Sequence, residues 1–369
     1  MKAKVALVGV GGYGYNYVEN LCRLAEENRI DFVAAAEFAP EKWQERIETL
    51  QKHNVRIVKD ADELYSLGVD FDLVCLPVGI ESHEPLTIQA LEHNCNVMVE
   101  KPLAGSLAAV ENMISARNKT DRFIAVGYQH FYEPALQKVK ELLLSGKLGK
   151  ITKVKLMGRW PRGDAYYDRN YWAGKIFGRH SQILDSPYCN AFAHYINIVL
   201  YLAGKSRDEA ATPQLTAAEL SRSRDIENFD TGIVRFAAGD IPVTAMFTHC
   251  CAEASSPQIL FTCENGSVYY NESGSWQVAG ADGNVLPEFT VTCAAAHRNM
   301  FEAVIKCLTD RSQRICTPEI AAKHVMLMEE LYKKAEVKTL APEQYTIGEK
   351  GVRLNKGLAE AWDVMFAAL

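Results

Sequence analysis

Short, nearly uninterrupted apolar runs alternate with amphipathic stretches over residues 1–127. Such runs are typical of strands buried on both faces, and the stretches between them have the spacing of helices. The apolar runs predict strands at Val5–Val8, Ile30–Glu37, Arg56–Val58, Leu73–Pro77, Asn96–Glu100 and Phe123–Gly127. The amphipathic stretches predict helices at Tyr13–Asn28, Pro40–His53, His83–His93 and Leu107–Asn118. This alternation predicts a parallel, doubly wound sheet of the Rossmann type.

After residue 128 the pattern changes to longer strands in which polar and apolar positions alternate. Strands are expected at Ile151–Arg159, Thr231–Phe236, Val243–His249, Gln258–Thr262 and Ser267–Tyr270. Helices are expected at Pro134–Ser145, Ala295–Thr309 and Pro318–Ala335. Alternation of this kind is typical of an antiparallel sheet with one covered face. We therefore expect an α/β Rossmann domain over 1–127 and an α+β domain with a large, mostly antiparallel open sheet over 128–369.

Composition and charge narrow the class of protein. The 369 residues are 48% hydrophobic and 23% charged, and they carry a formal net charge of −6. This balance is typical of a globular protein and gives no electrostatic reason to expect nucleic acid or an anionic membrane as partner. No apolar stretch reaches the roughly 18 residues of a membrane span. The N-terminal sequence MKAKVALVGVGG enters a strand directly and leaves no room for a signal peptide.

The ten cysteines are scattered, with no C-x-x-C pair and no His/Cys cluster at zinc spacing. Several lie inside apolar runs, where a thiol behaves as a small hydrophobic side chain. We therefore expect a reduced, cytoplasmic protein without a bound metal.

Candidate cofactor chemistry begins at Gly9–Gly14, whose sequence GVGGYG fits G-x-G-x-x-G between an expected strand and helix. Such glycines allow a tight turn and let the backbone approach a pyrophosphate. The pattern alone also fits a glycine-rich turn, but Glu37 ends the second strand, where a carboxylate can bind ribose hydroxyls. The alternative for Glu37 is a solvated strand end. A carboxylate there would repel a 2′-phosphate, which favours NAD over NADP. The cofactor residues expected from this motif are Gly9, Gly11, Gly12, Tyr13, Gly14 and Glu37.

Glu100, Lys101 and Pro102 end the fifth expected strand, at the carboxyl edge where open α/β sheets bind ligands. Pro102 restricts Lys101 to an extended conformation and so orients the lysine. On spacing alone, the triplet also fits a surface Glu–Lys pair before a turn.

A further candidate helix begins near Pro187, since Asp185 or Ser186 before a proline is a helix-start signal. It is expected to end at Gly204. Its polar positions share one face and are Asn190, His194, Asn197 and Tyr201. Such a stripe also fits the solvated face of a surface helix.

These motifs, in this order, resemble the glucose–fructose oxidoreductase/inositol dehydrogenase/MocA (Gfo/Idh/MocA) family of NAD(P)-dependent oxidoreductases. The resemblance extends over Gly9–Gly14, Leu76-Pro77…His83, Glu100-Lys101-Pro102, Val126-Gly127-Tyr128-Gln129, Gly146…Gly149 and the helix of His194. It implies that Lys101 is the lysine and His194 the catalytic histidine of this family. It also implies cofactor contacts at Leu76, Pro77, His83, Glu100, Lys101 and Gln129, and substrate contacts at Lys101, Tyr128, Asn190 and His194.

The sequence departs from the family on that helix. The family often has Asp-x-x-x-His-x-x-Asp, whereas Asn190 and Asn197 flank His194 at this spacing. An aspartate raises the basicity of a neighbouring histidine and an asparagine does not. Asp185 can supply the missing charge only if it lies off the helix axis.

The segment Arg159–Trp172 is dense in aromatic and charged residues. Such mixtures commonly hold sugars, so we expect Arg159 and Trp172 to bind substrate. The alternatives are a loop that clamps its own fold and a contact between subunits.

The residues and the resemblance together predict an NAD-dependent oxidoreductase acting on CH–OH groups in carbohydrate metabolism. The substrate would be a sugar, polyol or inositol-like molecule, with Lys101 and His194 in proton transfer and Asn190 and Asp185 beside them. Two alternatives remain open: an NAD-dependent glycosidase with transient oxidation and no net redox, and a non-catalytic NAD- or sugar-binding protein. We also expect a homodimer or homotetramer formed through the C-terminal sheet.

Overall fold

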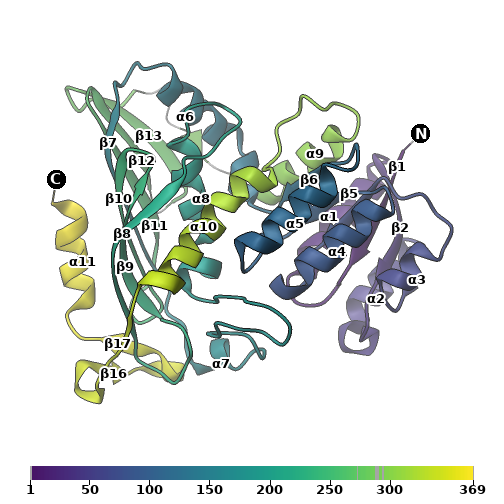
Figure 1. The fold of residues 1–369 in the computed structure, drawn as a ribbon, viewed down its shortest axis with the longest axis horizontal. Coiled ribbons are helices and arrows are strands. Elements are labelled where there is room, and N and C mark those ends of the chain that lie inside the picture. The colour runs from purple at the N-terminus through teal and green to yellow at the C-terminus, as the bar shows by residue number, and fades with distance from the viewer. Residues whose placement is uncertain (1, 272, 287–290, 293–294, 369) are drawn as a thin grey trace. The chain divides into compact units, whose positions relative to one another are not determined.

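The computed structural model describes residues 2–271, 273–286, 291–292 and 295–368. The chain forms two compact units (Figure 1), and each is described by itself. The first comprises Met1–Tyr132 and Ala296–Ala321, and the second comprises Glu133–Ala295 and Ala322–Leu369. The division expected after residue 127 did not anticipate the segment Ala296–Ala321. An amphipathic pattern predicts a helix but does not say which sheet the helix packs on.

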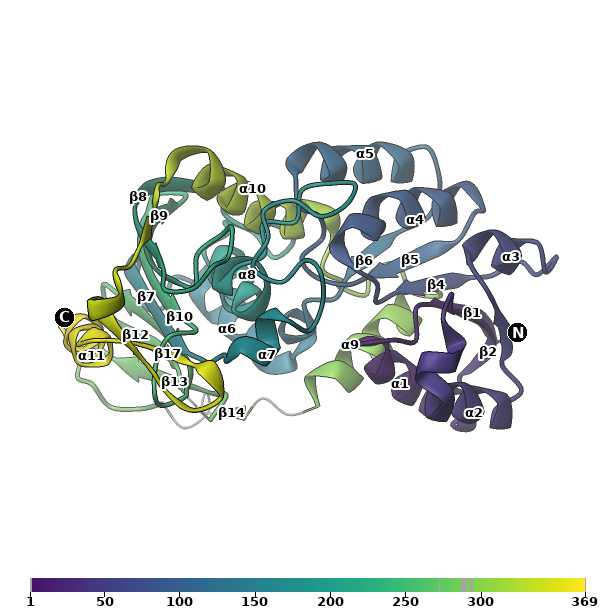
Figure 2. The same cartoon turned by 90° about the horizontal axis from the view of Figure 1, so that it is seen from below.

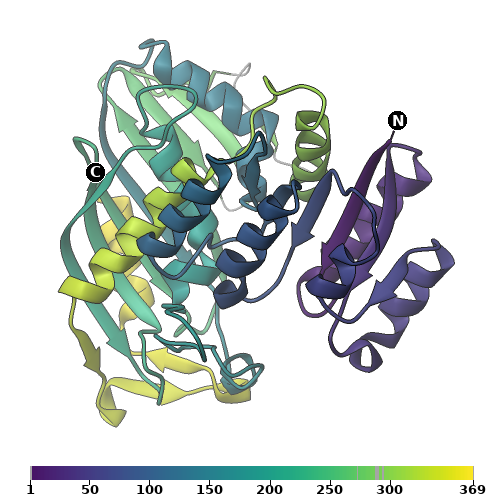
Figure 3. The ribbon, with the colours of Figure 1, turned by 45° about the vertical axis from the view of Figure 1, so that its right-hand side comes forward.

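The first unit contains a six-stranded parallel sheet in the order β3-β2-β1-β4-β5-β6. Its strands lie side by side in Figure 3 (purple and blue). They are β1 (Ala3–Val8), β2 (Ile30–Ala36), β3 (Arg56–Val58), β4 (Leu73–Leu76), β5 (Asn96–Val99) and β6 (Ile124–Val126). The strands β4, β5 and β6 are buried at every position, which explains their continuous apolar sequences. The predicted Rossmann sheet is confirmed.

Helices cover both faces of this sheet. Figure 2 shows α3, α4 and α5 on one side of the strands and α1, α2 and α9 on the other. Ser106 caps α5 by accepting a hydrogen bond from the Ala109 N–H, and Asp60 caps α3 in the same way. The short helix α3 was not predicted from sequence. The helical elements of this unit are α1 (Gly14–Glu26), η1 (Pro40–Trp43), α2 (Gln44–Lys52), α3 (Ala61–Tyr65), α4 (Ile80–Glu92), α5 (Leu107–Arg117), η2 (Gln129–Tyr132) and α9 (Ala296–Cys307).

The segment that contains α9 returns to the first unit through specific contacts. The Phe301 ring lies 4.9 Å from the Tyr17 ring of α1, edge to face. The Val126 N–H donates to the Cys316 carbonyl, so the segment also hydrogen-bonds to the last strand of the sheet. The first unit is therefore completed by residues from late in the chain.

The second unit contains a nine-stranded sheet in the order β14-β13-β12-β11-β7-β10-β9-β8-β15. Among the strands that the structure describes, only the pairs β7/β10 and β8/β15 are parallel, so the predicted, mostly antiparallel sheet is confirmed. Strands β8 and β13 were not predicted. The strands are β7 (Ile151–Arg159), β8 (Pro213–Arg222), β9 (Thr231–Ala238), β10 (Ile241–Thr248), β11 (Ser255–Cys263), β12 (Gly266–Tyr270), β13 (Ser275–Gly280), β14 (Val291–Thr292) and β15 (Val337–Thr339).

Helices cover both faces of this sheet at β7, which differs from the single covered face that alternation predicted. On one face, a Cβ at Gly158 would lie 2.6 Å from the Phe192 ring at the start of α8 (Ala193–Leu202). On the other face, the side chain of the preceding residue, Met157, packs with Met246 and with Trp362 of α11 (Leu358–Ala367). Figure 1 shows α11 on the side of the strands opposite to α8. The homodimer or homotetramer expected through this sheet stays a prediction.

Smaller elements complete the second unit. They are α6 (Pro134–Leu144), α7 (Asp164–Tyr167), the π turn Pro187–Ala191, the hairpin β16 (Tyr345–Ile347) and β17 (Arg353–Asn355), and most of α10 (Pro318–Lys334). The nine cysteines in the described residues are buried thiols, and the tenth, Cys293, lies outside them. Among the described helices, none combines the length and apolar character needed to span a bilayer.

Candidate functional site

The glycine-rich loop joins β1 to α1 and leaves room for a ligand. Gly12 has a φ of +48°, and a Cβ there would have no atom within 4 Å. A Cβ at Gly14 would lie 2.5 Å from the Gly9 carbonyl oxygen, so this position requires glycine. The loop is therefore tightly turned and open on the side of Gly12, at the N-terminus of a 13-residue helix. This shape fits a dinucleotide pyrophosphate.

Glu37 follows β2 and its carboxylate holds this loop. Oε2 accepts hydrogen bonds from the N–H groups of Val10 (3.0 Å) and Gly11 (3.2 Å). Oε1 accepts from the Ala39 N–H at 3.1 Å. The side chain is buried, so the solvated strand end considered from sequence is wrong. A carboxylate can accept further hydrogen bonds, so these contacts leave room for a ribose hydroxyl.

Two side chains that sequence reasoning missed also brace the loop. Arg46 of α2 donates from Nη1 to the Val10 carbonyl (2.5 Å) and to the Gly12 carbonyl (3.3 Å). The Trp43 ring covers Gly11, where a Cβ would meet it at 2.7 Å. The Arg46 guanidinium lies 4.6 Å from the centre of that ring. No sequence motif marks these positions, because they follow Glu37 in an ordinary helical stretch.

The loop lies at the switch point of the sheet. Strand β1 pairs with β2 on one side and with β4 on the other, so the connections leave in opposite directions. Leu76 ends β4, and the next two residues, Pro77 and Val78, pack against the glycines. Open α/β sheets bind ligands in the crevice at this point. The structure therefore brings Gly9–Gly14, Leu76 and Pro77 together.

Glu100 lies under the end of β5 as a brace for Lys101. Its Oε1 accepts from the Tyr17 hydroxyl (2.8 Å) and its Oε2 from the Lys101 N–H (3.1 Å). Burial raises the pKa of this carboxyl, and the Lys101 charge opposes the shift. A Cβ at Gly127 would lie 2.6 Å from the carboxylate, so the neighbouring strand end requires glycine. Because Glu100 is buried, the surface-pair alternative is wrong. The peptide bond from Lys101 to Pro102 is cis.

His83, for which a cofactor contact was predicted, lies against the turn after Lys101. Its Nδ1 lies 3.0 Å from the Pro102 carbonyl oxygen and 3.2 Å from that of Leu103. Its Nε2 lies 3.1 Å from the Val78 carbonyl oxygen. The ring is 1% exposed, and burial lowers its pKa. Both ring nitrogens face backbone, so this histidine positions the lysine segment.

Further polar groups lie near the strand ends of this unit. The Tyr13 hydroxyl of the glycine loop lies 2.6 Å from Nε2 of His297, the second residue of α9. Tyr128 is buried after β6, and Gln129 begins η2. Gln129 Oε1 is buried and has no hydrogen-bond partner among the described residues. Such a group fits a site that a ligand completes. The contribution of α9 was missed because His297 lies far away in sequence.

The helix of His194 differs from the solvated helix considered as an alternative. Every residue of α8 is buried, including His194, Asn197 and Tyr201, so the solvated-face interpretation is wrong. The predicted single helix begins as a π turn at Pro187, and α8 starts at Ala193. Periodicity could not reveal this burial, because the polar stripe packs inside the unit.

Asp185 lies before the helix and is linked to the amide that replaces the usual aspartate. Ser186 caps the π turn by accepting from the Cys189 N–H. Asp185 is therefore off the helix axis, as its sequence position required. Its Oδ1 accepts from Asn190 Nδ2 at 3.1 Å, and its Oδ2 accepts from the Gly174 N–H at 2.7 Å. A buried carboxylate thus stands beside Asn190.

The segment Arg159–Trp172 divides between the two faces of the sheet. Arg159, predicted to bind substrate, pairs with Asp363 of α11 at 3.2 Å and lies on the face away from α8. Strand alternation explains this, because Gly158 faces Phe192 on the other side. Trp172 lies near Arg169, whose guanidinium is 5.1 Å from the indole centre. The sequence prediction for this segment named Arg159 and Trp172 but not Arg162, which lies 5.8 Å from the Trp160 ring.

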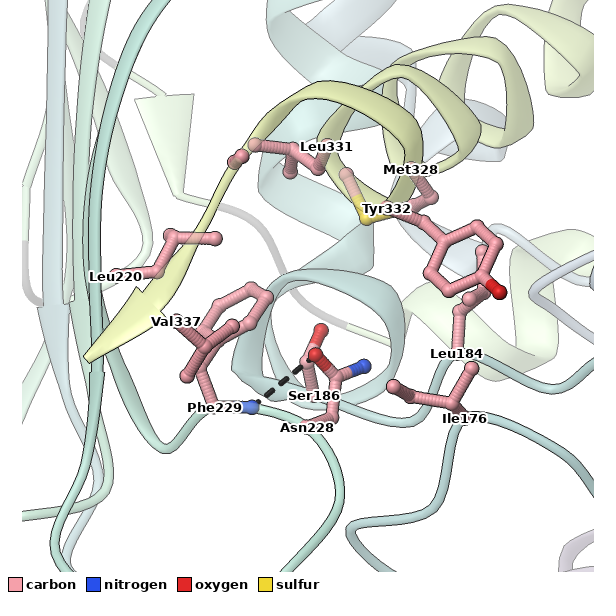
Figure 4. Close-up of a pocket in the computed structure, with 11 residues that line it drawn as sticks. Ile176, Leu184, Ser186, Leu220, Asn228, Phe229, Met328, Leu331, Tyr332 and Val337 are labelled. Atoms are coloured by element: carbon pink, nitrogen blue, oxygen red, sulfur yellow. Dashed lines mark hydrogen bonds between the residues drawn. The ribbon is translucent and has the colours of Figure 1, made fainter. Parts of the chain in front are cut away.

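A small apolar pocket of about 130 Å³ lies next to Ser186 (Figure 4). Asn228 Oδ1 there accepts from the Phe229 N–H at 3.1 Å. The remaining lining is mostly aliphatic and aromatic: Ile176, Leu184, Leu220, Met328, Leu331, Tyr332, Ala335 and Val337. Its described lining includes none of the predicted site residues, and its size and apolar character do not suit a sugar with a dinucleotide.

Comparison with known proteins agrees with the geometry of the first unit. The Gfo/Idh/MocA family model, described as an oxidoreductase family with an NAD-binding Rossmann fold, matches residues 3–128. The matched residues 3–128 make up about a third of the chain. The Gfo/Idh/MocA match covers the glycine loop, Glu37 and the Glu100–Pro102 triplet. The resemblance proposed from sequence is confirmed, and the first unit is an NAD(P)-binding Rossmann domain.

Relatives extend the likeness beyond this domain. The myo-inositol 2-dehydrogenase of Thermotoga maritima is 26% identical over 245 residues, which cover 65% of this chain and 67% of that enzyme. Other curated relatives are matched over 31–61% of their own length, which is less than two thirds of each. Among solved structures, this chain resembles the WlbA dehydrogenase of Bordetella pertussis, which was solved in complex with NADH and UDP-GlcNAcA. The TM-score is 0.75 at 20% identity, and the match covers 91% of this chain and 97% of the WlbA chain. The 3-ketoreductase KijD10 of Actinomadura kijaniata, in complex with NADP and TDP-benzene, has a TM-score of 0.71 at 14% identity, covering 92% and 100%. These structures share the fold of both units.

Proposed function

We propose that this chain is an NAD-dependent dehydrogenase that oxidises a secondary alcohol of a sugar, polyol or inositol-like substrate, or catalyses the reverse reduction. The observation that carries the proposal is the open glycine loop after β1 at the switch point, with Lys101 just after β5, two strands along the same sheet. The family match of residues 3–128 and the inositol dehydrogenase relative support it. Bound NAD would supply the hydride chemistry at its nicotinamide ring.

The cofactor would be held mainly by backbone. The N–H groups at the start of α1 would face the pyrophosphate, with Gly12 leaving space for it. Glu37 would bind ribose hydroxyls from its place against the loop. We propose NAD over NADP because a 2′-phosphate would meet this buried carboxylate, and the repulsion would cost about 1.4 kcal/mol or more, a tenfold loss of affinity.

Lys101 and His194 would carry the proton. As the substrate C–H bond breaks, the hydroxyl O–H bond also breaks and its proton passes to His194, leaving a carbonyl. Lys101 would polarise the same oxygen or share the proton, and Glu100 would fix the lysine backbone. Asn190, held by Asp185, would hydrogen-bond the substrate or orient the histidine. Tyr128 and Trp172 would complete the substrate contacts.

A panel of sugars and inositols, assayed for NADH fluorescence with NAD, tests this function. We expect NADH formation with at least one neutral or acidic sugar or polyol. Lys101→Ala should abolish turnover while the dissociation constant of NAD changes only a few-fold, because the lysine lies at the end of β5 rather than in the glycine loop. Lys119→Ala, an exposed lysine of the same unit, is the matched control and should keep full turnover. If Lys101→Ala keeps most of the turnover, the proposed role of this lysine is wrong.

A further inference from the structure

Two arginine side chains of the second unit lie against one tyrosine ring. The Arg169 guanidinium carbon is 3.5 Å from the centre of the Tyr166 ring. The Arg162 guanidinium carbon is 5.0 Å from the same centre. Two positive charges therefore share a single ring in a segment that the sequence already marked for its density of aromatic and charged residues.

The carboxylate of Asp164, which lies in the same segment, forms ion pairs with other arginines. Asp164 pairs with Arg224 and with Arg353, each at 3.2 Å. Within the described residues, neither Arg162 nor Arg169 forms an ion pair. Two neighbouring cations without a counter-ion repel each other, and an anion bound between them would remove that repulsion.

Buried polar atoms beside the arginines also lack partners. Arg162 Nε is buried with no hydrogen-bond partner among the described residues, and the same holds for His249 Nε2. The His249 ring is 2% exposed and lies 5.3 Å from the Tyr166 ring. Burial lowers the pKa of His249 well below its usual value, and Arg162 adds to this, so the ring stays neutral. Such unpartnered buried groups fit a site that a ligand completes.

The arginines border the helix of the proposed catalytic histidine. Arg162 lies 5.8 Å from the Trp160 ring, and that ring stacks on Phe192 at 4.4 Å. Phe192 immediately precedes α8, two residues before His194. On the other side, the Asp185 carboxylate acts electrostatically on Tyr166 and accepts from Asn190. A ligand on the arginines would therefore extend along the start of this helix.

We propose that Arg162 and Arg169 form an anion subsite, so that the substrate carries a carboxylate or phosphate group in addition to the alcohol that is oxidised. The proposal rests on the dehydrogenase function above and narrows its substrate class to acidic sugars or polyols. Arginine suits this role, because its planar guanidinium donates two parallel hydrogen bonds to a carboxylate or phosphate. The Asp185 carboxylate, which acts electrostatically on Tyr166, is already held by Asn190 and Gly174.

Calorimetric titration of the full chain with NAD present tests the subsite. The probes are D-glucose, D-glucuronate and glucose 6-phosphate, which share a ring and differ in the anionic group. One of the two acidic sugars should bind at least tenfold more tightly than glucose, and which one it is separates a carboxylate from a phosphate. Arg162→Gln and Arg169→Gln should each reduce this preference by about tenfold to a hundredfold. Added salt should reduce it in the unmodified chain.

Two further variants separate anion binding from a loop clamp. Arg162→Lys keeps the charge without the planar fork and should retain part of the preference, and Arg207→Gln, an exposed arginine paired with Glu141, should retain all of it. Equal affinity for the three sugars overturns the proposal. The proposal is also overturned if Arg162→Gln and Arg169→Gln both keep the preference for an acidic sugar but have lower melting temperatures. The arginines would then only hold the loop in place. NADH formation in the same samples is scored separately, because its absence would refute the dehydrogenase function without removing a measured anion preference.

Discussion

Replacing Glu37 by glutamine tests whether this carboxylate shapes the cofactor loop before any cofactor binds. Three backbone N–H groups, those of Val10, Gly11 and Ala39, donate to its two oxygens. Glutamine keeps one acceptor oxygen and turns the other position into an NH₂ donor. In either orientation of the amide, at least one buried N–H then faces another donor.

The magnitude follows from the number of bonds lost. A hydrogen bond to a charged group contributes about 1.5–3 kcal/mol, and a buried donor left without an acceptor costs about 1–3 kcal/mol. Glu37→Gln should therefore lower the unfolding free energy of the first unit by about 2–3 kcal/mol. For a unit of this size the melting temperature should fall by about 4–12 °C, without any ligand present. NAD affinity should fall as well, because the loop loses its shape.

Differential scanning calorimetry of the ligand-free protein measures this change. Asp31→Asn is the matched control, since it removes a carboxylate from the same strand at a position whose side chain is 56% exposed and 3.9 Å from Lys2. The control should change stability by less than about 0.5 kcal/mol. If ligand-free Glu37→Gln melts together with the unmodified chain and only NAD affinity falls, Glu37 acts on the ribose alone and the reasoning about the loop is refuted.

Further changes test the second unit. If His194 is the base, kcat/KM for alcohol oxidation should rise with pH, and His194→Ala should abolish this rise. Asn190→Asp should place a second carboxylate 3.1 Å from Asp185, and the repulsion between the two should make the folded chain bind an extra proton. That raised pKa stabilises the variant only at low pH, so its melting temperature relative to the unmodified chain should fall as the pH rises from about 5 to 8, and parallel melting curves would contradict the contact. Trp362→Ala should lower the free energy of chemical unfolding by about 3–5 kcal/mol, because the ring is buried against the sheet. Val364→Ala, at an exposed position of the same helix, should lower it by less than about 0.5 kcal/mol. Equal losses for the two variants would show that α11 does not cover the sheet.

The Rossmann sheet could be predicted because its signals are local. Each strand of the first unit is a short apolar run bounded by turns, and parallel order follows from the alternation with helices. The strands β8 and β13 were missed for the opposite reason. Eight of the ten residues of β8 are exposed or half-buried, so its alternation is weak. The helix α11 was missed because its apolar face packs on the outer side of a sheet expected to be open.

For the site, the sequence predicted which positions of the first unit take part, but it did not predict the hydrogen-bond partners of each side chain. The acidic residue after β2 was expected to face a ribose, and the structure shows Glu37 bonded to the loop itself. His83 was expected at the cofactor, and its ring is enclosed by backbone carbonyls. A motif identifies a residue type at a place, whereas hydrogen-bond partners depend on chain segments that fold back from elsewhere. The same limit hid Trp43, Arg46 and His297, which reach the loop from α2 and α9.

The position of Asp185 in the structure changes the interpretation of the amides on the helix of His194. From sequence, Asn190 removes the carboxylate that the family often carries four residues before the histidine. In the structure, the cap at Ser186 places Asp185 outside the helix, and Asn190 donates to it from within. The negative charge is therefore absent from the helix but present one hydrogen bond away from it, buried and held by two donors. Because a buried carboxylate lies beside Asn190, the amides do not by themselves argue for a non-catalytic protein.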